Sequence, residues 1–377
     1  MESALQSGKR PGASPSAVRL RGSGPRDRRH HVKGLLASSR FQATASAILA
    51  VGLFAFFLSR VHLSEIAASI RAASPGWMAA SAAISLSTFA IRALRWVWIL
   101  RPVGRVPWWP SYRATAIGFA ANTVLPARAG EVLRPAILAR ECSLPFAALL
   151  ASIVFERILD ALAQITYLGI ALGTGGAAAG GIVSSGRLRL AVAALAAVAV
   201  VVALFAVLWR EATERLLDVL FRILPERFRP AAHRVAHTFL DGFASLKTPR
   251  LAALVGLGSL FLWFVINVQV YCVLRAFGLS LPLTAAFVTT SAAVLGLVVP
   301  TPGGVGGYHA AVQFALTRFY GVPLATATGV ALIAHAVSFV PISLIGFTLF
   351  AASPFRKSGW KELSGSADAP QKPAELG

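Results

Sequence analysis

The segment Asn122-Thr-Val-Leu-Pro-Ala-Arg-Ala-Gly-Glu-Val-Leu-Arg134 places Arg128, Glu131 and Arg134 inside an otherwise apolar stretch of the chain. A second charged run, Phe155-Glu-Arg-Ile-Leu-Asp160, follows inside the next apolar stretch. A charged side chain at mid-bilayer costs roughly 2.5–3.5 kcal/mol on insertion scales, so such residues pair and face a protein interior or a wet cavity. We therefore expect the two segments to meet inside a membrane protein.

The surrounding composition is that of a polytopic membrane protein. Apolar residues make up 56% of the 377-residue chain and charged residues 14%, and the mean hydropathy is +0.67. Windows without Asp, Glu, Lys or Arg that are long enough to span a bilayer recur along the chain. They are residues 41–59, 190–209, 251–274, 276–317 and 319–355. No soluble domain of useful size fits between them.

The net charge of +21 is concentrated in segments that flank the apolar ones, at 1–40, 210–250 and 356–372. This placement is typical of cytoplasmic loops, which also attract anionic lipid, and it excludes nucleic acid as the expected partner. Cys142 and Cys272 provide neither a disulfide framework nor a metal-binding spacing. No nucleotide-binding motif is present, and we expect no cofactor and no metal.

The composition divides the chain into three regions. Residues 1–40 are rich in Ser, Gly, Pro and Arg, and we expect a disordered basic cytoplasmic tail there. Residues 41–351 form the expected transmembrane domain, which includes the basic cytoplasmic segment 210–250. Residues 352–377 form a cytoplasmic C-terminal tail.

Six apolar segments are expected to cross the membrane as full helices. They are Phe41–Ser59, Trp77–Leu100, Leu144–Leu172, Leu190–Trp209, Leu251–Leu274 and Ala325–Phe350. With the N-terminus in the cytoplasm, residues 61–71 form a helix on the outer surface, the uncharged loop 173–186 lies outside, and Glu211–Ile223 lies along the inner surface.

The cytoplasmic end of the second expected span is rich in arginine and tryptophan. Arg92, Arg95 and Arg101 occur there together with Trp96 and Trp98. Aromatic and basic residues gather at membrane interfaces, and long arginine side chains reach outward to the headgroups. We interpret Arg92 and Arg95 as residues of this interfacial belt and not as ligands.

Two further apolar segments are interrupted. Ala114–Leu125 has about 12 residues, fewer than the roughly 20 that a spanning helix needs. Pro126 and Gly130 follow it, and a second short helix is expected from Glu131 to Arg140. This pattern predicts a re-entrant helical hairpin that enters from the cytoplasm.

The second interruption is Pro300-Thr-Pro-Gly-Gly-Val-Gly-Gly307, which separates Pro282–Val299 from Tyr308–Phe319. We expect a second hairpin here, entering from outside, although ordinary loops between full spans would also give an even number of crossings. The expected fold is thus all-α, with about six full transmembrane helices and two hairpins, eight apolar segments in pseudo-inverted halves. Broken helices at matching positions of inverted halves indicate a transporter site near the midplane.

Each break exposes backbone N–H groups at the positive end of a helix dipole, which suits an anion. At the first break, Arg128 and Arg134 can hold phosphate oxygens in fork geometry, and Asn122 can donate from the preceding turn. Glu131 either caps the second helix or pairs with an arginine. These four residues are candidate lipid-headgroup ligands, and a purely structural Arg–Glu latch is the alternative.

At the second break, glycines allow a headgroup to approach the backbone closely, and their N–H groups can form a nest. The candidate headgroup ligands there are Gly303, Gly304, Gly306, Gly307, His309 and Gln313. A plain tight turn is the alternative. We interpret His335, in the last span, as an interior histidine with a satisfied hydrogen bond.

Glu156, Arg157 and Asp160 lie within about one helical turn, with Glu156 and Asp160 on one face. Unpaired, the three groups would cost roughly 7–10 kcal/mol by simple addition, so they require partners. Arg128 and Arg134 are the expected partners. The functional interpretation is a polar network that lines or gates the substrate cavity, and the alternative is a structural link between helices. Nothing indicates hydrolytic chemistry, and we assign no catalytic residue.

These residues resemble the lysylphosphatidylglycerol synthase transmembrane region, also called the flippase-like domain family. It is the membrane half of the bacterial multiple-peptide-resistance proteins and also occurs alone. The similarity rests on Asn122-x-x-Leu-Pro-x-Arg-x-Gly-Glu-x-x-Arg134, on Glu156-Arg-x-x-Asp160 and on Pro302-Gly-Gly-x-Gly-Gly307. It extends over roughly residues 41–351.

The resemblance implies a lipid translocase of the bacterial inner membrane, multi-pass with both termini cytoplasmic, that moves an anionic or aminoacylated phospholipid between leaflets. Membrane lipids are the implied partners, alongside a homo-oligomer or an envelope-lipid biosynthesis partner. In the family a separate soluble domain transfers lysine from charged tRNA to phosphatidylglycerol. Because only 22 residues follow Phe355, we expect no phosphatidylglycerol lysyltransferase activity. That activity is one alternative, and a non-transporting scaffold in envelope-lipid, hopanoid or glycolipid metabolism is another.

Overall fold

The computed structural model describes residues 44, 48–55, 57–59, 61–125, 128–174, 194, 248–299 and 301–353, and every structural statement below concerns these residues. All the regular elements among them are helices, which confirms the expected all-α class. Most of the predictions for the two tails, the loop 173–186, the span Leu190–Trp209 and the segment 210–250 with Glu211–Ile223 lie outside the described residues. Pro126 and Pro300 also lie outside them.

Three described helices are long and apolar enough to cross a membrane, namely α3 (Pro75–Leu100), α10 (Pro249–Ala276) and α13 (Leu324–Ala352). Each coincides with an expected span to within a few residues. Their length and composition support a helical membrane protein, while the total number of spans stays a prediction. The helix expected at 61–71 is also present, as α2 (Leu63–Arg71), while its location on the outer surface stays a prediction.

A fourth long helix, α6 (Phe146–Gly173), has 28 residues, at the place of the expected span Leu144–Leu172. It differs from the other three because Glu156, Arg157 and Asp160 interrupt its apolar sequence. Its buried face includes both carboxylates, so the helix directs its charge toward the protein interior.

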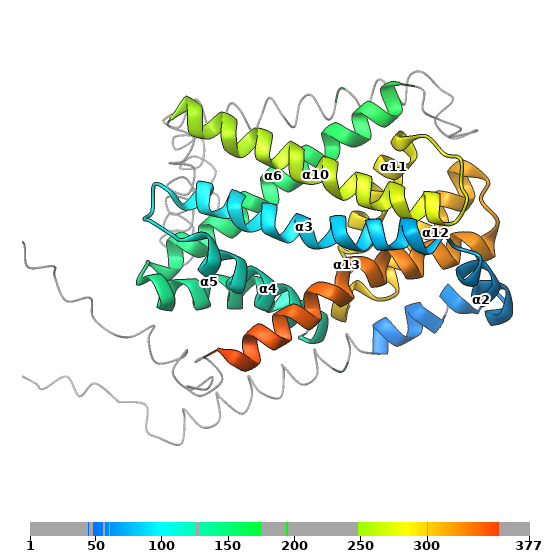
Figure 1. Cartoon of the computed structure of the whole chain (residues 1–377), viewed down its shortest axis with the longest axis horizontal. Helices are drawn as coiled ribbons and strands as arrows, with labels where there is room; N and C mark the ends of the chain where they lie inside the picture. The colour runs from blue at the N-terminus through cyan, green and yellow to red at the C-terminus, as the bar shows by residue number, and fades with distance from the viewer. Residues whose placement is uncertain are drawn as a thin grey trace, which may run out of the picture. The chain divides into compact units, whose positions relative to one another are not determined.

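Helices α3 and α10 run side by side in opposite directions (Figure 1). The N–H of Ser74, at the start of α3, donates to the carbonyl of Ala276, at the end of α10, at 2.8 Å. Further along, Ser81 donates to the carbonyl of Gln269 at 3.0 Å. We refer to the antiparallel pair of α3 and α10 as the α3–α10 frame. At one of its ends α3 begins and α10 ends, and at the other end the reverse holds.

The first expected hairpin is formed by α4 (Trp108–Val124) and α5 (Gly130–Cys142), which have 17 and 13 residues. At 1.5 Å per residue they are about 25 and 20 Å long, short of the roughly 30 Å hydrocarbon core. The two helices cross where Gly118 faces Gly130, and a Cβ on Gly130 would collide with the carbonyl oxygen of Gly118. Glycine is therefore required for the close contact of these helices.

The second hairpin is formed by α11 (Leu283–Gly296) and α12 (Gly307–Tyr320), each of 14 residues or about 21 Å. It is closed in the same way as the first. A Cβ on Gly296 would collide with the carbonyl of Gly307, and a Cβ on Gly307 would collide with that of Gly296. Both hairpins consequently depend on a pair of glycines.

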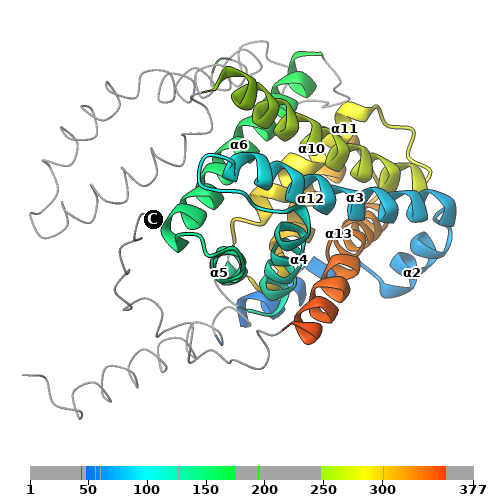
Figure 2. The same ribbon diagram turned by 60° about the vertical axis from the view of Figure 1, so that its left-hand side comes forward.

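The hairpins begin at opposite ends of the α3–α10 frame and point toward each other (Figures 1 and 2). α4 follows the C-terminal end of α3, whereas α11 follows the C-terminal end of α10, where α3 begins. The tips meet in the middle: Arg128 Nη2 donates to the carbonyl of Leu297 at 2.5 Å. The two short opposed hairpins match the expected arrangement, and the membrane face from which each enters stays a prediction.

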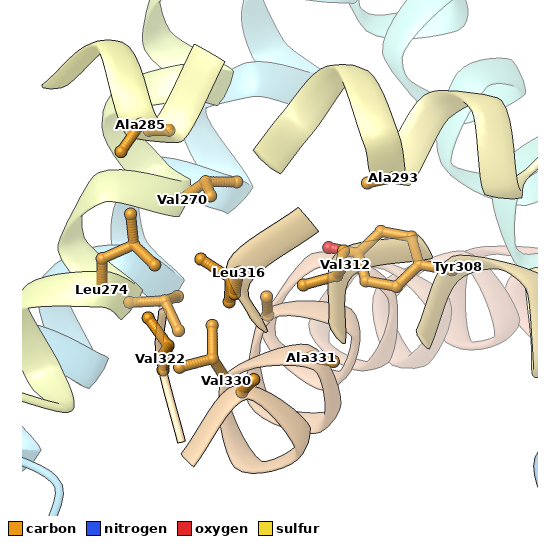
Figure 3. Packing of buried hydrophobic residues seen from close by; sticks show 14 of the residues in the cluster. Val270, Leu274, Ala285, Ala293, Tyr308, Val312, Leu316, Val322, Val330 and Ala331 are labelled. Carbon is orange, nitrogen blue, oxygen red and sulfur yellow. The ribbon is translucent and has the colours of Figure 1, made fainter. Parts of the chain in front are cut away.

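Separate apolar clusters hold the two hairpins in place. Around the second hairpin, side chains of α10, α11, α12 and α13 interdigitate (Figure 3), and they include Val270, Leu274, Ala285, Val312, Leu316 and Val330. Around the first hairpin, α3, α4, α5 and α6 contribute the second cluster, which includes Trp96, Leu100, Ile117, Ile137, Leu138 and Leu149. Where the tips meet, polar and charged side chains occur together with apolar ones.

Candidate functional site

A stripe of polar residues runs along the buried face of α3. Ser81, Ser85, Thr88, Arg92 and Arg95 follow one another at spacings of three and four, and all are buried. Residues at these spacings share one face of a helix. The arginines therefore point into the protein at the level of the charged residues of α6.

Arg92 and Arg95 bind the two carboxylates of α6. Arg95 Nη1 lies 2.7 Å from Asp160 Oδ1, and Arg95 Nη2 lies 3.3 Å from Glu156 Oε1. Arg92 Nη1 lies 3.3 Å from an oxygen of each carboxylate. Our assignment of Arg92 and Arg95 to an interfacial belt is wrong, because Arg95 is 0% and Arg92 only 7% exposed. Arg92 precedes the end of α3 by roughly two turns, and its guanidinium is directed to the carboxylates of α6.

Arg134 of α5 and Arg157 of α6 complete the network. Arg134 Nη1 lies 3.2 Å from Glu156 Oε1. This pair confirms Arg134 as one of the two arginines that the sequence predicted to bind the charged residues of α6. The guanidinium of Arg134 also stacks on Trp96, with Cζ 3.8 Å from the ring centroid. Arg157 lies 3.4 Å from Glu156 and 3.5 Å from Asp160. We refer to Arg92, Arg95, Arg134, Glu156, Arg157 and Asp160 as the charge cluster.

Neutral donors and acceptors complement the cluster. The indole N–H of Trp263 donates to Asp160 Oδ1 at 3.0 Å, so this carboxylate is bound from three helices. Ser259 Oγ accepts from Arg95 Nη1 at 3.0 Å. A buried charge is tolerated only when ion pairs and hydrogen bonds replace its lost hydration. Asp160 meets that condition.

The charge cluster carries more positive than negative charge. Four arginines face two carboxylates, which leaves an excess of two positive charges among these described residues. Several guanidinium nitrogens lack a hydrogen-bond partner, namely Nε of Arg92, Arg95, Arg134 and Arg157 and Nη2 of Arg134 and Arg95, the last of which is held by its ion pair alone. One acceptor of the cluster, Oε2 of Glu156, also lacks a partner, so the unpartnered donors outnumber the unpartnered acceptors. Buried donors without acceptors are costly, so the cluster is suited to receiving an anion.

Arg128 is placed at the contact between the hairpin tips. Its guanidinium donates to the Leu297 carbonyl and lies 3.7 Å from the carboxylate of Glu131. Of the two roles expected for Glu131, a helix cap or an ion pair with an arginine, the structure shows the ion pair. Arg128 does not pair with Glu156 or Asp160, contrary to our expectation. Its φ of 53° lies in the left-handed region, which is uncommon for a residue with a side chain.

Asn122 closes the first hairpin through its carbonyl group. Its Oδ1 accepts from the N–H of Gly130 at 2.8 Å. The first N–H groups of a helix lack partners within the helix, so this bond satisfies one of them. Asn122 thus holds the start of α5 while its side chain borders the cavity described below.

The second tip bends through Gly303, Gly304 and Gly306, whose φ angles of 60°, 71° and 89° favour glycine. His335 Nε2 lies 2.7 Å from the carbonyl of Gly303, which agrees with the interpretation of His335 as a satisfied interior histidine. His309 Nδ1 accepts from the N–H of Gly306 at 3.3 Å. The bend is therefore fixed by two imidazole rings, whose centroids are 4.5 Å apart.

Two adjacent cavities lie at the meeting point of the tips. The larger, of about 300 Å³, is lined at one end by Arg92, Arg128, Arg157 and Asp160. The smaller, of about 120 Å³, is lined by the first hairpin and by the glycine bend, including Asn122, Glu131, Arg134, Gly303 and Gly304. Arg128 and Arg157 line both cavities, together with Phe119, Leu297 and Phe339, so these five side chains form the partition between them.

The larger cavity also reaches the surface of the helix bundle. Val298, at the end of α11, lines it and is 73% exposed. Its remaining apolar lining includes Phe89, Val294 and Leu297. The cavity thus combines a charged interior end with an apolar route toward the outside of the bundle.

The structure brings most of the candidate ligands together, but not all of them. Asn122, Arg128, Glu131, Arg134, Gly303 and Gly304 line the smaller cavity. His309 is buried against Phe54 and Phe57, and Gln313 Nε2 donates to Thr328 on α13 at 2.7 Å. Neither residue lines a described cavity, and the same holds for Gly306 and Gly307, which serve the bend and the helix contact.

Long apolar helices, together with two short opposed hairpins around a charge cluster, define a helical membrane protein. Residues 43–346 match the family described as Lysylphosphatidylglycerol synthase TM region, so the chain belongs to this family, as its motifs predicted. Glycosyltransferase AglD of Haloferax volcanii is 29% identical over 333 residues, covering 79% of this chain and 52% of AglD. The chain spans about half the length of this relative.

Proposed function

We propose that this protein translocates a lipid with an anionic headgroup between the two leaflets of the membrane. The observation that carries the proposal is the excess of two positive charges beside a cavity at the contact between two broken hairpins, where three buried arginines and the partly exposed Arg157 face two buried carboxylates. A phosphate group would supply the missing negative charge and the acceptors for the free guanidinium N–H groups. Broken helices at mid-membrane are the usual location of transporter sites.

The partition between the cavities suggests the route. Arg128 and Arg157 face both cavities, so a phosphate could pass from one cavity to the other without losing contact with a guanidinium. Opening the partition requires separation of the hairpin tips, which the bond from Arg128 to the Leu297 carbonyl holds together. A bound phosphate would compete with that carbonyl for the guanidinium, because the charged acceptor is the stronger one. Headgroup binding would thereby loosen the contact that blocks passage.

The acyl chains would remain outside the protein. A cavity of about 300 Å³ is at the small end of the range for ligand sites, which suits a headgroup and not a whole lipid. The apolar lining near the exposed Val298 would let the chains extend into the bilayer. Burial of the headgroup alone is what a translocase requires.

The test is the Arg128→Ala variant in proteoliposomes that contain a fluorescent phosphatidylglycerol. The accessibility of the probe to an external reductant reports its movement between leaflets. We expect the variant to insert and fold but to lose translocation, whereas Arg105→Ala, at an exposed arginine outside the hairpins, keeps it. Unchanged translocation in Arg128→Ala would contradict the proposed role of this arginine.

Two other functions remain as alternatives, each with its own test. The first is phosphatidylglycerol lysyltransferase activity, which we disfavour because the family description names only the transmembrane region of the synthase. It predicts that the purified protein with charged tRNA and lipid yields lysyl-lipid. The second is a non-transporting scaffold in envelope-lipid, hopanoid or glycolipid metabolism, and the one observation beside it is that the relative AglD is named a glycosyltransferase. Lipid translocation by the purified protein alone would count against the scaffold.

We further propose that the membrane is the bacterial inner membrane and that both termini are cytoplasmic. The support is the concentration of Lys and Arg in segments next to apolar helices. Under this orientation the first hairpin enters from the cytoplasm and the second from the opposite side. Reporter fusions at the two termini, which score cytoplasmic or external location, test the assignment.

A further inference from the structure

The larger cavity has a second lining beyond its arginines, made of uncharged hydroxyl and amide side chains. Thr88 of α3, Gln269 of α10, Thr290 of α11 and Ser338 of α13 contribute to it. They come from four different helices. A headgroup whose phosphate reached the charge cluster would place its remaining atoms among these side chains.

Among the polar residues of this lining, Thr290 gives the evidence for a bound ligand. Its hydroxyl has no hydrogen-bond partner, although the residue is only 4% exposed. Its neighbour Thr289, which is 1% exposed and does not line the cavity, satisfies its own hydroxyl by donating to the carbonyl of Ala285 at 2.8 Å. A buried hydroxyl without a partner is costly, so a group with hydrogen-bonding capacity at this position would stabilise it.

The other polar side chains of the lining still have acceptor capacity. Thr88 donates its hydroxyl hydrogen to the carbonyl of Ser85 at 2.6 Å, and Ser338 donates to that of Ala334 at 2.7 Å. In each case the lone pairs of the hydroxyl oxygen can accept a hydrogen bond from a ligand. The lining can therefore both donate to a ligand hydroxyl, through Thr290, and accept from one.

The charges around the cavity select against a cationic headgroup. Asp160 is the one acidic residue among the described lining of the larger cavity, and it already pairs with Arg92, Arg95 and Arg157. An ammonium group would have to displace an arginine, and it would meet the excess positive charge of the cluster. It also has no lone pair with which to accept from Thr290.

We propose that the transported lipid carries an uncharged, hydroxyl-bearing group beyond its phosphate, such as a glycerol or a sugar, and not an aminoacyl or amino group. Thr290 and Ser338 hold these hydroxyls while the arginines hold the phosphate. This inference rests on the proposed function, and it narrows the range of anionic and aminoacylated lipids to one chemical class.

The test measures lipid binding to the full-length protein in nanodiscs with probes that share their acyl chains and carry a phosphate group, a monoester in phosphatidic acid and a diester in the other three. The probes are phosphatidic acid, phosphatidylglycerol, phosphatidylethanolamine and lysyl-phosphatidylglycerol. We expect phosphatidylglycerol to bind at least tenfold more tightly than the two probes with amino groups. Phosphatidic acid, which has the phosphate alone, should bind severalfold more weakly than phosphatidylglycerol.

The variant Thr290→Val keeps the shape of the side chain and removes its hydroxyl. It should abolish the preference for phosphatidylglycerol over phosphatidic acid without changing the affinity for phosphatidic acid. Thr289→Val is the matched control and should keep the preference. Ser338→Ala carries the same test if Thr290→Val does not fold.

The outcomes separate this inference from the proposed function. If phosphatidic acid and phosphatidylglycerol bind no better than a phosphatidylcholine background, the proposed function fails. If both bind but lysyl-phosphatidylglycerol or phosphatidylethanolamine binds equally well, for example on the aromatic rings of Phe89, Phe119 and Phe339, only the inference is overturned. A preference that persists in both variants also overturns it.

Discussion

The first hairpin carries Arg128, Glu131 and Arg134 around its tip, whereas the second carries glycines and no charged residue between Leu297 and Gly307. Both are closed by a glycine pair, and both consist of helices of 13 to 17 residues, shorter than the roughly 20 that a spanning helix needs. The two hairpins therefore have similar geometry but different chemical groups at their tips. The first contributes charged side chains, and the second contributes the backbone carbonyl of Leu297, which accepts a hydrogen bond from Arg128.

The two tips also differ in backbone strain. In the second tip the left-handed positions are glycines, which adopt them without a steric penalty. Among the described residues of the first tip, the left-handed position is Arg128, where a residue with a Cβ costs of order 1–3 kcal/mol. A glycine there would relieve the strain but would remove the guanidinium, so the strain at Arg128 is consistent with a use for its side chain.

The largest effect is expected where the first hairpin is attached to α6 by charge. Glu156→Gln removes a buried carboxylate that Arg92, Arg95 and Arg134 share, and it raises the positive excess of the cluster. Breaking a buried ion pair on one side costs about 3–5 kcal/mol, so we expect a large loss of thermal stability in detergent.

The control for this experiment is Glu131→Gln, at the pair between Arg128 and Glu131. These side chains are 46% and 29% exposed, and such pairs contribute about 1 kcal/mol or less. Similar unfolding temperatures for the two variants would show that the charge cluster does not stabilise the first hairpin. The second hairpin, attached by apolar packing, has no corresponding carboxylate among its described residues.

An intermediate loss of stability is expected when a glycine of either pair is replaced, and the loss should be similar in the two hairpins. Gly130→Ala and Gly307→Ala each force a methyl group against the backbone of the partner helix, and overpacking of this kind costs about 1–3 kcal/mol. Gly256→Ala in α10, with no atom within 4 Å of its Cβ, should be neutral or stabilising by up to about 1 kcal/mol. Unequal losses of unfolding temperature for the two hairpins would contradict a shared mode of closure.

The sequence predicted the elements of the hairpins well and their long-range partners only in part. Short apolar segments, followed by Gly130 in one case and by a glycine run in the other, were sufficient to place both breaks. The partner of Arg134 was also predictable, because Glu156 needed a cation nearby. The N-terminal boundary of α4 was predicted less accurately, because this helix begins at Trp108 and not at Ala114.

The role of Arg92 and Arg95 was missed because their position near a helix end, beside Trp96, is typical of an interface. The signal that could have revealed them is the continuation of the polar stripe through Ser81, Ser85 and Thr88. Arginines that extend to the headgroups are not expected to share a helix face with a continuous row of polar residues. Arg92 and Arg95 share such a face, which indicates partners inside the protein. The separation of His309 from the cavity could not be predicted, since it depends on contacts with Phe54 and Phe57 that lie far away in the sequence.

The smallest effect is expected at the hydrogen bonds that hold each tip, and it distinguishes the two hairpins by function. Asn122→Leu frees the N–H of Gly130, and His335→Phe keeps a ring in place but frees the carbonyl of Gly303. Each lost hydrogen bond costs about 0.5–1.5 kcal/mol, so the unfolding temperatures should fall slightly and by similar amounts. Because Asn122 borders the smaller cavity and His335 lines neither, lipid translocation should decrease more in Asn122→Leu than in His335→Phe. The reverse order would place the function in the glycine tip and not in the charged one.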